Sequence, residues 1–239
     1  MHVQTVRFLH IFVQNIRYHH TVYLPVVNDT TIRNATAACI QMLKARGFTV
    51  ARLRVDEELD TLVDQYPGKV TVVPPEEHVS DVERCIRTYK ERTRAILSGL
   101  PYKHVSRNFV RELVAEVTDT INAVPASDGV SDRLSPTSIV TGATPPSFHD
   151  FTLRFGEYVI APTNPQQTNT NYPRGIEAIV MSKSGNGGYR FLSLSTGNIF
   201  TRAHWTPYEH VPIHALALVK DLATRDNIPP LRDQPLVFK

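Results

Sequence analysis

Cysteine is scarce in this chain: among 239 residues there are only two, Cys39 and Cys85. Both stand in segments whose apolar spacing predicts helix, and neither belongs to a Cys-x-x-Cys pair. A structural zinc site needs several closely spaced thiolate or imidazole ligands, and a disulfide framework needs a denser set of paired cysteines. The sequence therefore predicts no zinc and no disulfide framework, and it fits a reducing compartment.

Long apolar runs are missing as well. No stretch reaches the roughly 18 consecutive apolar residues that a transmembrane helix requires. The apolar start, Met1 to Asn15, carries Arg7 and His10 and lacks a small-residue cleavage site, so it does not have the pattern of a signal peptide. We expect no membrane partner and a nuclear or cytoplasmic protein that is not secreted.

Charge of one sign is not in large excess, because 26 Lys and Arg face 23 Asp and Glu. The distribution is uneven, however, since one short region is strongly basic with Glu91 as its only acid. Its basic residues are Arg84, Arg87, Lys90, Arg92, Arg94, Lys103 and Arg107. Such a local surplus is the electrostatic pattern of a phosphate-binding surface. The alternative is an ordinary solvated helix face.

The first half of the chain alternates between strand-like and helical patterns. Strands are predicted at 3–13, 21–27, 48–55 and 69–73, and helices at 30–45, 57–65, 78–98 and 106–121. In the helix at 78–98, an apolar stripe recurs at 79, 82, 86, 89, 93 and 96, the spacing of a buried helical face. This order predicts an α/β fold with a mixed sheet and flanking helices.

The amino-acid composition of the chain changes at about Pro125. Residues 126–154 read as a linker, rich in Pro, Ser, Thr, Asp and Gly, with one short helix at 136–141. Short strands follow at 156–161, 176–182, 189–194 and 198–202, with turn signals between them, which predicts a small all-β barrel at 155–210. The end, 211–239, is predicted to be a terminal helix at 211–225 and a Pro-rich tail.

Two carboxylates are the candidate catalytic and metal-binding residues. Asp56 directly follows a predicted strand, and Glu83 lies in the early turns of the basic helix. Carboxylates placed in this way can hold the Mg²⁺ ions of a phosphoryl-transfer site. The alternatives are a turn or cap role for Asp56 and an ion pair with Arg87 for Glu83. His19, His20 and His78 are weaker candidates, because single histidines are usually structural or solvent-facing.

Several short motifs stand in one collinear order. They are Asp56–Asp60, Glu77–Val79, Val82–Arg92, Ile121–Pro125, Asp128–Asp132, Leu134–Pro136, Ile139–Gly142, Phe155–Val159, Gly187–Tyr189, Ser193–Gly197 and Arg202–Thr206. This set resembles the integrase region of a copia-type LTR retrotransposon Pol polyprotein, over about residues 30 to 225. The resemblance implies a ribonuclease-H-like core at 1–125 with a truncated first strand, followed by an SH3-like barrel.

The resemblance also implies roles for individual residues. Asp56 matches the second acid of the family's Asp-Asp-Glu triad and Glu83 the third, at a shorter interval than is usual. No Asp or Glu occurs in residues 1–28, where the first acid is expected, so the triad is incomplete. By this resemblance, Mg²⁺ or Mn²⁺ would be the cofactor of an active form. DNA, as the element ends and the target, would be the partner, and the chain would also be able to form a homo-oligomer. We expect DNA binding through Arg84, Arg87, Lys90, Arg92, Arg94 and Lys103 without integration. The alternatives are a non-catalytic nucleic-acid or protein-binding module and a ribonuclease-H-like nuclease.

Overall fold

The computed structural model describes residues 1–73, 80–144, 152–163, 174–184 and 187–231. It is a mixed α/β protein with several sheets and divides into two compact units. Unit 1 comprises Met1–Arg92 and Val117–Pro146, and unit 2 comprises Thr93–Glu116 and Ser147–Lys239. Two helices, α3 (Ser80–Ser98) and α4 (Arg107–Asn122), contribute residues to both units. No helix in the described part of the chain is long and apolar enough to cross a membrane.

Unit 1 begins with an antiparallel sheet in the order β1–β2–β3. Its strands are β1 (His2–Val3), β2 (Val6–Val13) and β3 (Tyr18–Tyr23). The sequence predicted one strand at 3–13, but the chain reverses direction between β1 and β2, where Gln4 has a positive φ of 52°. The second strand was predicted at 21–27; it starts earlier, at Tyr18, because it pairs with β2 as far as Val13.

Helix α1 (Asp29–Ala45) confirms the helix predicted at 30–45. A capping box fixes its start: the Asn28 side chain accepts from the Thr31 amide at 2.8 Å, and the Thr31 hydroxyl accepts from the Asn28 amide. Gly47, at φ +87°, follows its end in a conformation that other residues rarely adopt. One face of α1 packs on the sheet, where Ile32 lies in a cluster with Leu9 of β2.

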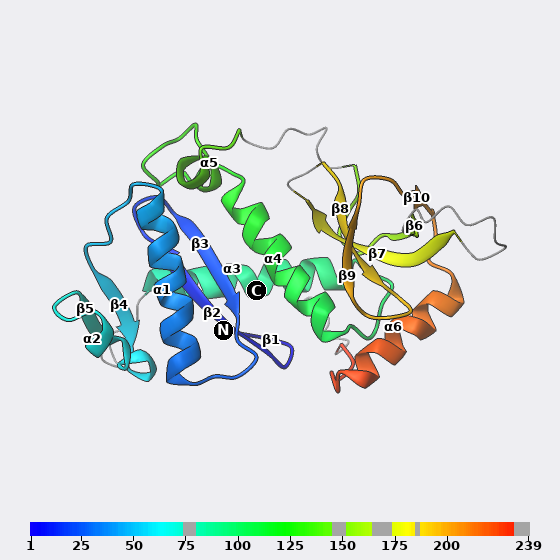
Figure 1. Cartoon of the computed structure of the whole chain (residues 1–239), viewed down its shortest axis with the longest axis horizontal. Helices are drawn as coiled ribbons and strands as arrows, with labels where there is room; N and C mark the ends of the chain where they lie inside the picture. Colours follow the sequence, from blue (N-terminus) through cyan, green and yellow to red (C-terminus); the bar gives the residue numbers. More distant parts are fainter. Residues whose placement is uncertain (74–79, 145–151, 164–173, 185–186, 232–239) are drawn as a thin grey trace. The chain divides into compact units, whose positions relative to one another are not determined.

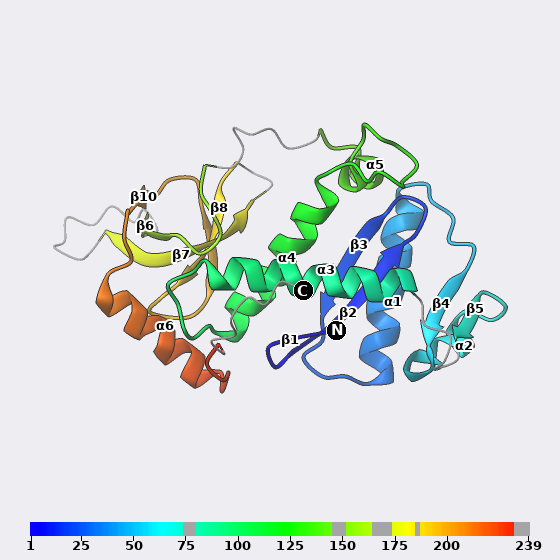
Figure 2. The same cartoon turned by 180° about the vertical axis from the view of Figure 1, so that it is seen from behind.

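A second, two-stranded sheet lies across α1 from β2 and β3 in both views (Figures 1 and 2). Its strands, β4 (Leu53–Asp56) and β5 (Val70–Val73), are parallel and are linked by η1 (Glu57–Leu59) and α2 (Leu62–Gln65). The predicted strand at 48–55 is shorter than expected, because residues 48–52 join no ladder. The two sheets are not hydrogen-bonded to each other among the described residues, so the α/β class is confirmed while the single mixed sheet is not.

The remaining helix of unit 1 is α5 (Pro136–Thr141), which confirms the short helix predicted there. Ser135 caps its start by accepting from the Ser138 amide at 3.2 Å, and Gly142 ends it at φ +71°. α4 is tied to β3 by Asn122, whose side chain bonds both the amide and the carbonyl of His19, at 2.8 and 2.7 Å. These contacts tie the end of α4 to β3.

Unit 2 is built on a five-stranded antiparallel sheet in the order β10–β6–β7–β8–β9. Its elements are β6 (Tyr158–Pro162), β7 (Gly175–Lys183), β8 (Tyr189–Ser193), β9 (Ile199–Arg202), β10 (Thr206–Pro207) and helix α6 (Ile213–Arg225). The four predicted strands and the terminal helix are confirmed within a few residues. β9 and β10 are the sheet edges and do not pair with each other in the described residues, so closure into an SH3-like barrel stays a prediction.

The core of unit 2 gathers Val159, Val180 and Phe191 with Trp205 packed against them. One charged side chain is buried at its margin: Glu112 of α4 is 6% exposed and pairs with Arg190 of β8 at 2.7 Å. The pairing removes the large cost of burying an isolated carboxylate.

Candidate nucleic-acid interface

Helix α3 is held in unit 1 by Tyr89. This side chain is fully buried, with its ring centroid 4.9 Å from that of His10 and 5.7 Å from that of His19. Its hydroxyl donates to the Thr118 hydroxyl of α4 at 3.1 Å. Tyr89 therefore anchors the inner face of α3 on the sheet, and the opposite face is turned outward.

The outward face of α3 is basic. All of the predicted phosphate-binding residues of this helix, Arg84, Arg87, Lys90, Arg92 and Arg94, are exposed. The three-residue spacing of Arg84, Arg87 and Lys90 places them on one side of the helix, with Glu91 among them. Arg92 lies at the flank nearer the sheet, where its charge contributes to lowering the pKa of His19. Arg94 and the exposed Lys103 belong to unit 2, so the basic face of unit 1 consists of Arg84, Arg87, Lys90 and Arg92.

The two predicted metal ligands are exposed. Asp56 ends β4 beside Val73 of β5, and although it precedes η1 its side chain makes no capping hydrogen bond. Glu83 lies in the first turn of α3, where a negative charge is favourable to the helix dipole. Within the described residues no group of three or more His, Cys, Asp or Glu side chains is arranged to hold a metal ion. His78 lies outside the described residues. Asp56 and Glu83 as ligands stay a prediction.

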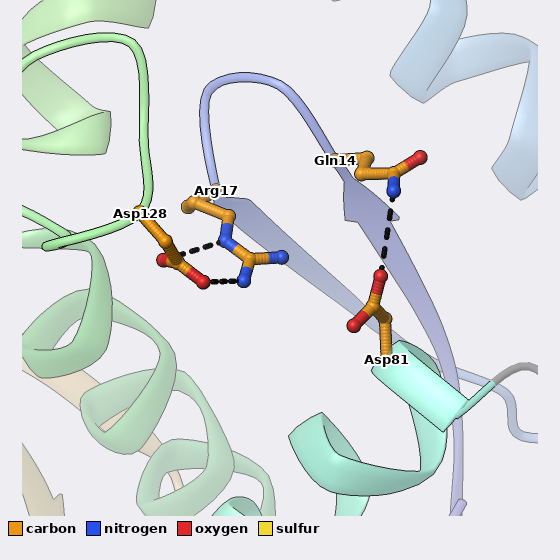
Figure 3. Close-up of polar contacts among 4 residues, drawn as sticks. All are labelled: Gln14, Arg17, Asp81 and Asp128. Carbon is orange, nitrogen blue, oxygen red and sulfur yellow. Dashed lines mark hydrogen bonds and ion pairs between the residues drawn. The ribbon is translucent and has the colours of Figure 1, made fainter.

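A different acid of α3 faces the turn between β2 and β3. Asp81 accepts from the Gln14 side-chain amide at 3.4 Å (Figure 3). In the same turn Arg17 forms a two-pronged ion pair with Asp128, one arm being Nε to Oδ1 at 2.8 Å. These four side chains, with Asn15, Gly129 and Val130, line a hollow of about 360 Å³. Sequence reasoning missed this polar cup, because Arg17 and Asp128 are 111 residues apart and no local pattern links them.

His19, one of the weaker candidates for a metal or phosphate contact, lies against His10, which was not among those candidates. His10 and His19 stack, with ring centroids 5.4 Å apart, and their Nε2 and Nδ1 atoms are 3.2 Å apart. Burial, together with the charge of His19, the N-terminal ammonium and His20, lowers the pKa of His10 to about 3. Burial, with Arg17 and Arg92, lowers the pKa of His19 to about 4. Burial also lowers the pKa of His20. The lowered pKa values keep the rings of His10 and His19 uncharged near pH 7, and Tyr89 of α3 packs on both of them.

No protein-family model and no curated protein matches the chain. Among solved structures, the chain is similar to one described as a cryo-EM structure of the simian T-cell lymphotropic virus intasome in complex with PP2A regulatory subunit B56 gamma. The similarity covers 85% of this chain and 75% of that chain, with 12% sequence identity and a TM-score of 0.36. A TM-score this low carries no weight in assigning a function.

Proposed function

We propose that this protein binds nucleic acid through the outward face of α3. The observation that supports the proposal is the row of exposed basic side chains, Arg84, Arg87 and Lys90, with exposed Arg92 at the flank, on a helix whose other side is anchored in the core. Such residues neutralise phosphates and release counterions without reading bases. The binding is therefore tolerant of sequence and strongly dependent on salt.

We infer a finer role from the resemblance of the sequence to copia-type integrases. In this proposal residues 1–125 form a ribonuclease-H-like core, 126–154 a linker, 155–210 an SH3-like barrel and 211–239 a terminal helix and tail, and the partner is element and target DNA. Asp56 and Glu83 would hold Mg²⁺ or Mn²⁺, which would activate the attacking oxygen. A two-metal reaction needs closely fixed ligands on both ions. Two carboxylates are too few to fix two metal ions, so strand transfer is not expected. DNA binding does not need the metal ions and is therefore retained.

The basic face is tested by a triple variant, Arg84→Gln with Arg87→Gln and Lys90→Gln. We expect affinity for a duplex of arbitrary sequence to fall about tenfold or more at moderate salt. The slope of log affinity against log salt should become shallower by roughly one per replaced residue. Fluorescence anisotropy over a salt series measures both quantities.

The matched control removes the same charge elsewhere. Lys44, Lys69 and Lys220 are exposed and lie on α1, before β5 and on α6. Replacing all three by Gln should leave the salt slope nearly unchanged. Equal losses in the two triple variants would mean that net charge, and not the α3 face, determines binding.

The carboxylates are tested by Asp56→Asn combined with Glu83→Gln. We expect unchanged or slightly higher DNA affinity, because two negative charges are removed and one of them, Glu83, lies on α3 itself. We expect no cleavage or joining product from either protein with Mg²⁺. Gel analysis of a labelled duplex distinguishes the candidate functions, integrase and nuclease, from binding alone. Mg²⁺-dependent joining by the parent chain that the variant loses would identify an integrase, and cleavage without joining a nuclease.

A further inference from the structure

The polar cup of unit 1 is walled almost entirely by hydrogen-bonding groups. It lies between the turn that joins β2 to β3, the first turn of α3 and the loop that follows α4. Val130 is the only apolar side chain among its lining residues, and the volume of the cup, about 360 Å³, is at the small end of the range for ligand sites. A hollow of this size and polarity suits one planar, polar group.

Arg17 is fixed at the wall of the cup. Its Nε and Nη2 atoms donate to the two carboxylate oxygens of Asp128, and its guanidinium carbon lies 5.2 Å from the centroid of the Phe12 ring. Such two-pronged pairing sets the plane of a guanidinium. Arg17 also has a φ of 55°, a backbone conformation that is costly for residues with a Cβ atom. Arginine thus stands in the turn at a position whose backbone favours glycine, which indicates that its side chain is needed there.

One hydrogen-bond donor and one acceptor are left over in the cup. Among the described residues, neither Nη1 of Arg17 nor Oδ1 of Asp81 takes part in a hydrogen bond. Figure 3 shows both atoms turned toward the space between the Arg17–Asp128 pair and the Gln14–Asp81 pair. Oδ2 of Asp81 accepts only a long bond, 3.4 Å, from Gln14, and a carboxylate oxygen has room for a second. The cup therefore offers one donor beside a carboxylate that can accept two.

We propose that the cup binds an unpaired guanine base of a nucleic-acid strand that lies on the basic face of α3. On its Watson–Crick edge guanine presents one acceptor, O6, followed by two donors, the N1–H and the N2 amino group. O6 would accept from Nη1 of Arg17, and the two donors would bond the two oxygens of Asp81. The order of groups on this edge is the complement of the order in the cup.

The proposal rests on nucleic-acid binding by α3 and adds a base preference to it. Asp81 lies three residues before Arg84, so the cup adjoins the start of the row formed by Arg84, Arg87 and Lys90. A strand whose phosphates contact this row can direct one unstacked base into the cup. In a duplex the same guanine atoms bond cytosine, so the binding of a duplex stays tolerant of sequence.

The other bases match the cup less well. Adenine, cytosine and thymine each present a single donor group on this edge, so one oxygen of Asp81 would stay unused. A site built to bond a polar group discriminates against an analogue that lacks this group. Hypoxanthine differs from guanine only by lacking the N2 amino group, and it is therefore the matched control base.

The test measures the binding of short single-stranded DNA by fluorescence anisotropy. The strands are runs of adenine that carry guanine, hypoxanthine or adenine at one central position. We expect the strand with guanine to bind about tenfold more tightly than the other two. In the Asp81→Asn variant, which replaces one accepting oxygen by a donating amide, the ratio of the affinities for the guanine and adenine strands should fall to about one.

Asp29→Asn is the control variant, because Asp29 is an exposed acid in the first turn of α1. It should keep the preference for guanine. Equal binding of the three strands by the parent chain would overturn the proposal, and so would a preference that Asp81→Asn keeps or that Asp29→Asn also loses. Equal binding that the triple variant of Arg84, Arg87 and Lys90 weakens would leave the role of the α3 face intact, whereas binding of none of the strands would count against both proposals.

Discussion

Replacing Tyr89 by Ala should lower the free energy of unfolding by about 3–5 kcal/mol, the cost of deleting a large buried ring. Tyr89 is 0% exposed and is the largest fully buried side chain of α3. Its ring contacts His10 and His19, so truncation would leave a cavity between α3 and the sheet. Urea unfolding followed by circular dichroism measures the loss. Because the basic face rests on this anchor, the DNA affinity of the Tyr89→Ala variant should fall as well.

Tyr89→Phe is the matched control, since it removes only the hydroxyl. Thr118 keeps a second partner, the Thr21 hydroxyl at 2.7 Å, so the expected loss is only about 1 kcal/mol. DNA binding should be unaffected. If Tyr89→Ala cost no more than Tyr89→Phe, the ring would not hold α3 on the sheet, and the orientation of the basic face would need another explanation.

The helices could be predicted from sequence because their signals are local. The apolar spacing of the basic helix selected positions 89 and 93, and both Tyr89 and Thr93 are buried. The five arginines and lysines assigned to the opposite side are exposed. The start of α1 and the end of that helix were likewise marked by Asn28 and Gly47, residues whose effect on the backbone depends on immediate neighbours.

The sheets were less predictable because strand pairing depends on distant residues. Residues 48–52 have the β-branched and aromatic content of a strand, yet they line a cleft in unit 1 where no described strand pairs with them. Likewise, an acid in the first turn of a helix carries no signal of what it faces. Glu83 was selected from sequence, while Asp81, two residues earlier, is the acid placed at the polar cup. Such choices depend on the rotation of α3 about its axis, which packing determines.

The histidine pair beneath α3 gives the protein a predicted sensitivity to acid. Both rings are neutral in the folded chain, and one ring nitrogen must donate to the other across 3.2 Å. Protonating both rings would oppose two N–H groups and two charges inside the core. Arg17, Arg92 and the N-terminal ammonium add to this repulsion, since their charges also lower the two pKa values.

We therefore expect stability to fall by about 2–4 kcal/mol between pH 7 and pH 5. The pKa values of His10 and His19 are depressed from 6.5 to about 3 and about 4. Between pH 6.5 and about pH 3, the unfolded chain binds more protons than the folded one. The stability contribution is thus complete above pH 6.5, declines as the pH falls below that value, and levels off below about pH 3. Urea midpoints across this range measure it. Replacing both His10 and His19 by Phe should remove most of the slope, and His20, whose pKa burial also lowers, should account for the remainder. His204→Gln, at an exposed site in unit 2, should leave the profile unchanged. An equally steep profile in the double variant would assign the acid sensitivity to other groups.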